Sequence, residues 1–139
     1  NRHALVVDSQ TTVASGTAEV DAALTMLDRR PGTRRLTVAA DKNYDQKRFV
    51  AGARAANVTP HVAQHTRGRG SAIDARTTRH AGYAQSRNAR HRVETPFGWG
   101  KFNRPLKQTM LRGLARVGAQ ATLVFTSYNL VRIAALEAA

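Results

Sequence analysis

Apolar side chains in the first half of the chain fall into short runs separated by segments of helical periodicity. The runs His3–Asp8, Leu36–Ala40 and Val58–Ala63 are compact, rich in β-branched residues and bounded by polar ones. Each therefore predicts a strand. Pro60 favours an edge strand or an irregular one in the third run. Because a buried strand opens the chain, we expect the sequence to begin partway through a larger sheet domain.

Two helices are predicted between these strands. Thr17 is a plausible N-cap for a helix to about Arg30, and Asp45 for a helix to about Asn57. The expected apolar faces are Val20, Ala23, Leu24 and Leu27 in the first helix and Phe49, Val50, Ala53 and Ala56 in the second. The alternation of strand and helix predicts an α/β layer with parallel strands and right-handed crossovers.

The second half of the chain has a different pattern. From His65 to Arg92 it carries seven arginines against one acid, Asp74, and the stretch of about 65–82 reads as a flexible Arg-rich loop. Helix is predicted again from about Tyr83. A long final helix is indicated by apolar residues at three- and four-residue steps, namely Leu114, Val117, Ala121, Val124, Phe125, Tyr128, Val131 and Ala135. We expect this helix to cover one face of the sheet, and no domain boundary within residues 1–139.

Charge narrows the choice of partners. The formal net charge is +13, from 22 Lys and Arg against 9 Asp and Glu, which predicts a polyanionic partner, with nucleic acid favoured. A solvated basic surface or a membrane-surface binder is the alternative. No stretch reads as membrane-spanning, and neither cysteines nor a secretory signal are present. A reducing cytoplasm is the simplest location.

Two carboxylates are candidates for chemistry. Asp41 ends the strand Leu36–Ala40, where an α/β sheet places ligand-binding groups, and a carboxylate there can hold a divalent metal. The alternative is an Asp that caps a turn.

Glu94 lies among basic residues, and on a helix Arg90, Glu94 and Lys101 would share one face. The alternative for Glu94 is a simple ion pair with Arg90. Pro96 argues against a straight helix through this stretch.

Several segments together resemble bacterial DDE-type insertion-sequence transposases. They are Val38–Asp45, Val58–Gln64, Arg76–Tyr83, Val93–Lys101, Arg112–Val117 and Tyr128–Leu130. The resemblance covers nearly the whole chain. It implies an RNase H-like mixed sheet flanked by helices, with residues 1–139 as the C-terminal part of the catalytic domain, lacking its first strands.

The resemblance also implies a metal site and a reaction. Three carboxylates would hold two Mg²⁺ or Mn²⁺ ions, with Asp41 matching the second Asp of the family and Glu94 its Glu. Paired metals suit an in-line displacement at phosphorus, as in DNA strand cleavage and transfer. The first Asp is expected upstream of Asn1, so we expect the chain alone to be inactive. Asp8 is a disfavoured substitute because its segment corresponds to the third strand of the family.

Family members carry a Tyr, Arg, Glu, Lys signature around the third acid. Arg90 and Lys101 match it in their spacing from Glu94, but Arg87 occupies the expected tyrosine position. Trp99 could stack on an unpaired base or pack in the core. The residues expected to contact DNA are Lys42, Arg67, Arg69, Arg76, Arg79, Arg87, Arg90, Trp99 and Lys101.

Three functional readings follow. The first is a metal-dependent transposase acting on element ends and target DNA, assembled on DNA as a homo-oligomer by analogy and associated with the bacterial nucleoid. The second is a noncatalytic basic DNA-binding module from a decayed or repurposed transposase. The third, an RNA-binding basic protein, is disfavoured because the basic residues flank two acids instead of forming a tail.

Overall fold

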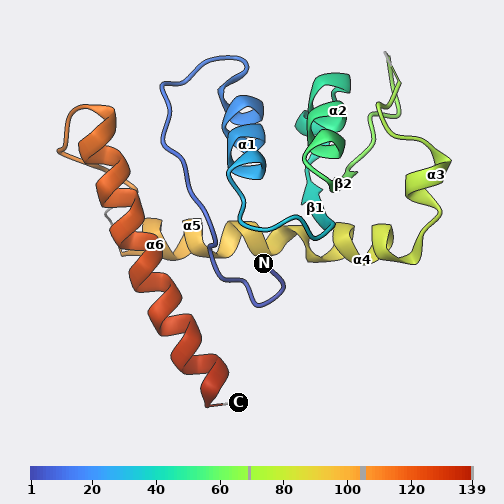
Figure 1. Ribbon diagram of the computed structural model, residues 1–139. Coiled ribbons are helices and arrows are strands. Elements are labelled where there is room, and N and C mark those ends of the chain that lie inside the picture. The colour runs from blue at the N-terminus through green and yellow to red at the C-terminus, as the bar shows by residue number, and fades with distance from the viewer. Residues whose placement is uncertain (69, 104–105, 139) are drawn as a thin grey trace. The chain divides into compact units, whose positions relative to one another are not determined.

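The computed structural model, drawn as a ribbon in Figure 1, describes residues 1–68, 70–103 and 106–138. The chain divides into two compact units. We call Gly16–Arg90 the sheet unit, and we call Asn1–Ser15 together with His91–Ala139 the terminal unit. These units describe packing within the chain, and the expectation that residues 1–139 contain no domain boundary stays a prediction. Each unit is described by itself below.

The sheet unit is built on two parallel strands, β1 (Leu36–Ala40) and β2 (Val58–Val62), joined through helix α2 (Lys47–Ala55). Their register runs from Leu36 opposite Val58 to Ala40 opposite Val62. Both predicted strands and their parallel pairing are thus confirmed. A chain that leaves one strand and returns parallel to it needs a crossover, and α2 supplies it.

Helix α1 (Ala18–Asp28) begins after Thr17 as predicted and ends two residues earlier than expected. Its Val20 is buried, while Ala23, Leu24 and Leu27 pack against the core, so the predicted apolar face is confirmed. In α2 the predicted residues Phe49, Val50 and Ala53 are buried, and Ala56 lies just past the helix end at the cap. Helical periodicity is a local property, which is why the sequence revealed both faces.

The core of the sheet unit joins these elements to helix α4 (Ala81–Ala89), which contacts both strands. Phe49 is 1% exposed and its ring meets the ring of Tyr44 edge-on at 5.0 Å. Tyr83 of α4 is buried, and its hydroxyl donates a hydrogen bond to the Val62 carbonyl at 2.9 Å. This bond ties α4 to the end of β2. A short helix, α3 (Ala75–Thr78), precedes α4.

One sequence prediction fails in this unit. Asp45 does not cap α2, because Gln46 occupies the N-cap position. The side chain of Asp45 is buried instead, and it accepts hydrogen bonds from the backbone N–H groups of His65 and Ala72. These two bonds hold the chain on either side of the start of the Arg-rich segment, and the flexibility expected of that segment stays a prediction.

The helical path after α4 is broken near Pro96. A 3-10 turn, η2 (Arg90–Val93), separates α4 from α5 (Glu94–Phe102). Proline has no N–H to donate to the carbonyl four residues earlier, and its ring crowds that carbonyl. The prediction that Pro96 prevents a single straight α-helix is confirmed.

In the terminal unit, α6 (Leu114–Glu137) packs on α5. Phe97 and Phe125 meet edge-on at 5.3 Å, and Trp99 and Tyr128 at 5.9 Å. The long final helix is confirmed. Within the terminal unit this helix packs on α5, and its predicted role of covering one face of the sheet stays a prediction. None of the described helices combines the length and apolarity needed to cross a membrane.

The segment His3–Asp8 is not a strand, which corrects the first strand prediction. The side-chain amide of Asn129 takes the place of a neighbouring strand: it accepts from the Val6 N–H at 2.9 Å and donates to the Val6 carbonyl at 2.7 Å. The Tyr128 hydroxyl donates to the Ala4 carbonyl at 2.9 Å. A buried backbone must satisfy its polar groups, and here side chains of α6 do so.

Candidate metal ligands and nucleic-acid contacts

Asp41 directly follows β1, at the carboxyl end of the strand. Its Oδ1 accepts a hydrogen bond from the Asn43 N–H at 2.7 Å and so begins the 3-10 turn η1 (Lys42–Tyr44). The turn-capping role is therefore real. It engages one carboxylate oxygen, and within the described residues Oδ2 accepts no hydrogen bond, which leaves it available to a cation.

The pKa of Tyr44 reflects the negative charge near Asp41. Burial, together with the negative charges of Glu19 and Asp41, raises the pKa of the Tyr44 phenol. The phenol therefore stays protonated and neutral next to this carboxylate. A site that gathers negative charge in this way favours a bound cation.

Glu94 is the first residue of α5 and is exposed. The helix follows directly on the 3-10 turn η2. Lys101 lies on the same helix, is exposed and follows Glu94 by two turns, so the two share a face as predicted. Asp41 belongs to the sheet unit and Glu94 to the terminal unit, and each is placed within its own unit.

The chemistry of the two carboxylates fits a hard divalent cation, since Mg²⁺ and Mn²⁺ prefer oxygen ligands. Within residues 1–68, 70–103 and 106–138, no group of three His, Cys, Asp or Glu residues gathers into a metal site. Asp41 and Glu94 can thus each contribute a ligand, while the described residues do not form a complete set.

Most of the predicted DNA contacts are exposed cations. In the sheet unit these are Lys42, Arg67, Arg76, Arg79, Arg87 and Arg90; Arg69 lies outside the described residues. Arg76 is bound by Asp74, with Nε and Nη2 lying 3.0 and 2.8 Å from Oδ2. Hydrogen bonds from the Arg76 side chain and backbone hold the pKa of Asp74 below its usual range. Arg76 is therefore the member of this group whose charge is matched by a carboxylate.

Sequence reasoning missed the role of Asp45, which is 1% exposed. Its Oδ2 accepts from the His65 N–H at 2.6 Å and its Oδ1 from the Ala72 N–H at 2.8 Å. Burial alone would raise the pKa of Asp45, but these backbone hydrogen bonds and one from the Ser71 side chain outweigh it and hold the pKa low. The carboxylate is accordingly ionised. Its proximity in sequence to Asp41 was the only signal that could have drawn attention to it.

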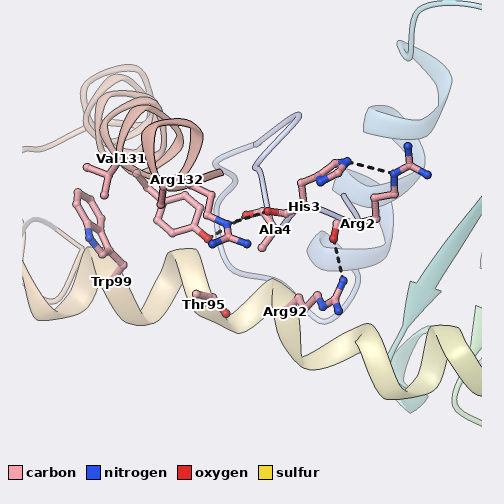
Figure 2. A pocket seen from close by; sticks show the side chains of 10 residues that line it. Arg2, His3, Ala4, Arg92, Thr95, Trp99, Val131 and Arg132 are labelled. Atoms are coloured by element: carbon pink, nitrogen blue, oxygen red, sulfur yellow. Dashed lines mark hydrogen bonds between the residues drawn. The ribbon is translucent and has the colours of Figure 1, made fainter. Parts of the chain in front are cut away.

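The terminal unit contains a pocket of about 510 Å³ lined by basic and aromatic side chains (Figure 2). Arg2, His3, Arg92 and Arg132 supply its basic side chains, and no Asp or Glu lines it. Trp99 and Tyr128 supply aromatic surface. Figure 2 shows Trp99 projecting from α5 toward Val131 of α6.

Backbone carbonyls orient two of these arginines. Arg92 Nη1 donates to the Arg2 carbonyl at 2.8 Å, and Arg132 Nε donates to the His3 carbonyl at 3.0 Å. A guanidinium has five N–H donors, so each keeps others for an anion. No local pattern marks Arg2, Arg92 and Arg132 in the sequence, because they come from three distant segments.

Trp99 is half-buried and packs edge-on against Tyr128 while also lining the pocket. Trp99 therefore contributes to packing and also offers an accessible aromatic surface, which are the two roles that the sequence left open. An aromatic face beside arginines suits a nucleotide, whose phosphate and base need the two kinds of surface.

Comparison with known families yields one match. The family model of the transposase DDE domain matches residues 1–130. Comparisons with curated proteins and with solved structures gave no match.

Proposed function

The chain belongs to the transposase DDE domain family, which acts in DNA transposition, and we propose that it contributes two metal-binding carboxylates, Asp41 and Glu94, to the cleavage and transfer of DNA strands. The observation that carries the proposal is the match over residues 1–130, which includes both acids. The parallel pair β1 and β2 with its α2 crossover supports an RNase H-like sheet as the scaffold.

Each carboxylate has a defined task in this proposal. The Asn43 N–H holds Oδ1 of Asp41 at the end of β1, and Oδ2 would be the oxygen that binds a metal. Glu94 offers its exposed carboxylate from the start of α5. When bound, paired Mg²⁺ or Mn²⁺ would activate the attacking oxygen and stabilise the leaving oxygen of the phosphodiester.

We further infer that a third carboxylate completes the set. In the family pattern the first Asp stands on an earlier strand than the segments matched here, which assigns it to sequence N-terminal to residues 1–139. The exposed Asp8 is the competing assignment. Under this proposal the chain by itself binds DNA and does not cut it.

The DNA-binding surface is proposed to combine two parts. The exposed arginines of the sheet unit, among them Arg67, Arg79 and Arg87, provide phosphate contacts that do not read sequence. The pocket beside Trp99 provides a second contact for a phosphate and its nucleotide. Transposition joins paired ends, so assembly of several copies on DNA and association with the nucleoid follow from this proposal.

The decisive test uses the protein extended N-terminally through the preceding strands. Mg²⁺-dependent nicking of DNA that carries candidate element ends is measured for Asp41→Asn and Glu94→Gln, with Asp74→Asn as a matched control that also removes one negative charge. We expect both ligand variants to bind DNA and fail to cut, while Asp74→Asn retains cleavage. Cleavage at the normal rate by either ligand variant would refute the assignment of that residue.

A noncatalytic DNA-binding module is the second candidate. It is supported by the formal net charge of +13, which favours binding to a polyanion without requiring a metal site. This candidate predicts that the extended protein binds DNA with a steep salt dependence but shows no Mg²⁺-dependent nicking under any condition. The nicking experiment therefore separates the two functions.

A further inference from the structure

A buried carboxylate holds the base of the Arg-rich loop. Asp45 lies between η1 and α2, and its two oxygens accept hydrogen bonds from the N–H groups of His65 and Ala72. Between these donors, the described residues 66–68, 70 and 71 belong to no helix or strand, and they include the exposed Arg67. One side chain thus joins the two ends of a loop that is distant from it in sequence.

Several hydrogen-bond donors converge on the buried carboxylate of Asp45. Burying an ionised carboxylate is expensive unless several donors satisfy it. Two backbone N–H groups and the Ser71 side chain do so here. In an open loop, water could accept hydrogen bonds from the same N–H groups. Their convergence on Asp45 therefore contributes to the shape of the loop.

Other features of the loop favour the same closed shape. The Gln64 side-chain amide donates to the Ile73 carbonyl at 3.1 Å, just outside the Asp45 contacts. Gly68 and Gly70 have φ of 70° and 74°, a left-handed conformation that glycine adopts without a steric penalty. The chain is therefore tied twice at the base of the loop and can turn sharply within it.

We propose that Asp45 is a positioning residue that closes the loop between His65 and Ala72 and so presents Arg67 to a phosphate of bound DNA. The proposal rests on the proposed function, which makes DNA the partner. A loop that is already ordered loses less conformational entropy on binding than a free one. The acid thereby strengthens the binding of an anion although its own charge opposes it.

The charge of Asp45 and its positioning role have opposite effects on DNA binding, so a substitution can tell the two apart. Asp45→Asn removes one negative charge and would tighten DNA binding if only overall charge mattered. The substituted amide has one oxygen and one NH₂ group, so one of the two backbone N–H groups would face a donor. Positioning therefore predicts weaker binding, which is the opposite sign.

Binding of the chain to a random-sequence DNA duplex is measured across a range of salt concentrations for wild type, Asp45→Asn, Arg67→Ala and the double variant. We expect Asp45→Asn to weaken binding several-fold and to reduce the log–log salt slope by roughly 0.9, as for one lost phosphate contact. Arg67→Ala should do the same, and the double variant should lose little more than either single one.

Asp74→Asn is the matched control, because it removes the same charge from an exposed acid next to the loop. It should bind DNA as tightly as wild type or more tightly. Hydrogen exchange of the His65 and Ala72 amides supplies a readout independent of DNA: both should lose protection in Asp45→Asn, while amides of α2 and β2 keep theirs.

Ser71→Ala covers the case in which Asp45→Asn unfolds the sheet unit. It removes one donor to the carboxylate and leaves the charge unchanged. It should shift binding and amide protection in the same direction by a smaller factor. Unchanged binding and salt slope in Ser71→Ala and in folded Asp45→Asn, or additive losses in the double variant, would overturn the proposal. A wild-type chain that binds no DNA would instead refute the proposed function, while the exchange experiment still tests the loop closure.

Discussion

Two glycines in α5 differ in what surrounds them, and we expect the same substitution to have different effects on stability at the two sites. A Cβ added at Gly98 would meet no atom within 4 Å. A Cβ added at Gly100 would lie 2.6 Å from Leu106 Cδ1 and 2.9 Å from Val124 Cγ1. Gly100 is buried, and Val124 is a buried residue of α6. Gly100 is thus a point of close approach between these helices.

The magnitudes follow from two effects. Replacing glycine by alanine inside a helix stabilises it by about 1 kcal/mol, and this gain is common to both sites. At Gly100 the added methyl group also overpacks the interface. The end of the Leu106 side chain can move aside, but Val124 is β-branched and stiff, so α6 itself must shift. Overpacking of this kind costs about 1–3 kcal/mol.

We therefore expect Gly98→Ala to be about 1 kcal/mol more stable than wild type and Gly100→Ala to be about 1–3 kcal/mol less stable than Gly98→Ala. Urea unfolding followed by tryptophan fluorescence measures the difference in the relevant unit, because Trp99 is the only tryptophan and lies in α5. Equal stability of the two variants would refute the close packing at Gly100.

Three further predictions concern buried polar contacts. Asn129→Asp places a carboxylate against the Val6 carbonyl and should lower the unfolding free energy by about 1–3 kcal/mol in urea titrations; an unchanged midpoint would contradict this. Tyr83→Phe leaves the Val62 carbonyl without its hydroxyl donor and should cost a similar amount, about 1–3 kcal/mol, whereas a loss within measurement error would show that the bond contributes nothing. Burial lowers the pKa of His61, so the folded state resists protonation and stability should fall as the pH drops below about 6.5. His61→Gln should flatten that part of the stability–pH curve, and an unaltered slope would exclude His61 as its cause.

Local patterns in the sequence predicted most of the secondary structure. Apolar periodicity identified α1, α2 and α6, and compact apolar runs identified β1 and β2. These signals are reliable because a helix or strand must place its apolar residues at a fixed period to bury one face. The same reasoning failed for His3–Asp8. An apolar run becomes a strand only if a neighbouring backbone pairs with it, and here the amide of Asn129 provides the pairing.

In the candidate site, too, some residues could be identified from the sequence and others could not. Asp41 and Glu94 could be named from their positions in recognisable motifs, and their assignment as metal ligands remains a prediction. Asp45 was read as a helix cap because Asp is common at that position, yet its partners are amides 20 and 27 residues further along the chain. The residue type alone does not show whether an Asp caps a helix or holds the two ends of a loop together.

The sequence alone determined the charge, the helices α1, α2 and α6, the parallel strand pair and the transposase family, because these depend on composition and on residues close together in the chain. Only the tertiary structure decided the split into two units, the closure of the Arg-rich loop by Asp45 and the pocket that gathers Arg2, Arg92 and Arg132. The physical reason is distance along the chain. The Val6 and Asn129 groups that bond to each other are separated by 123 positions, and no local pattern encodes such a contact.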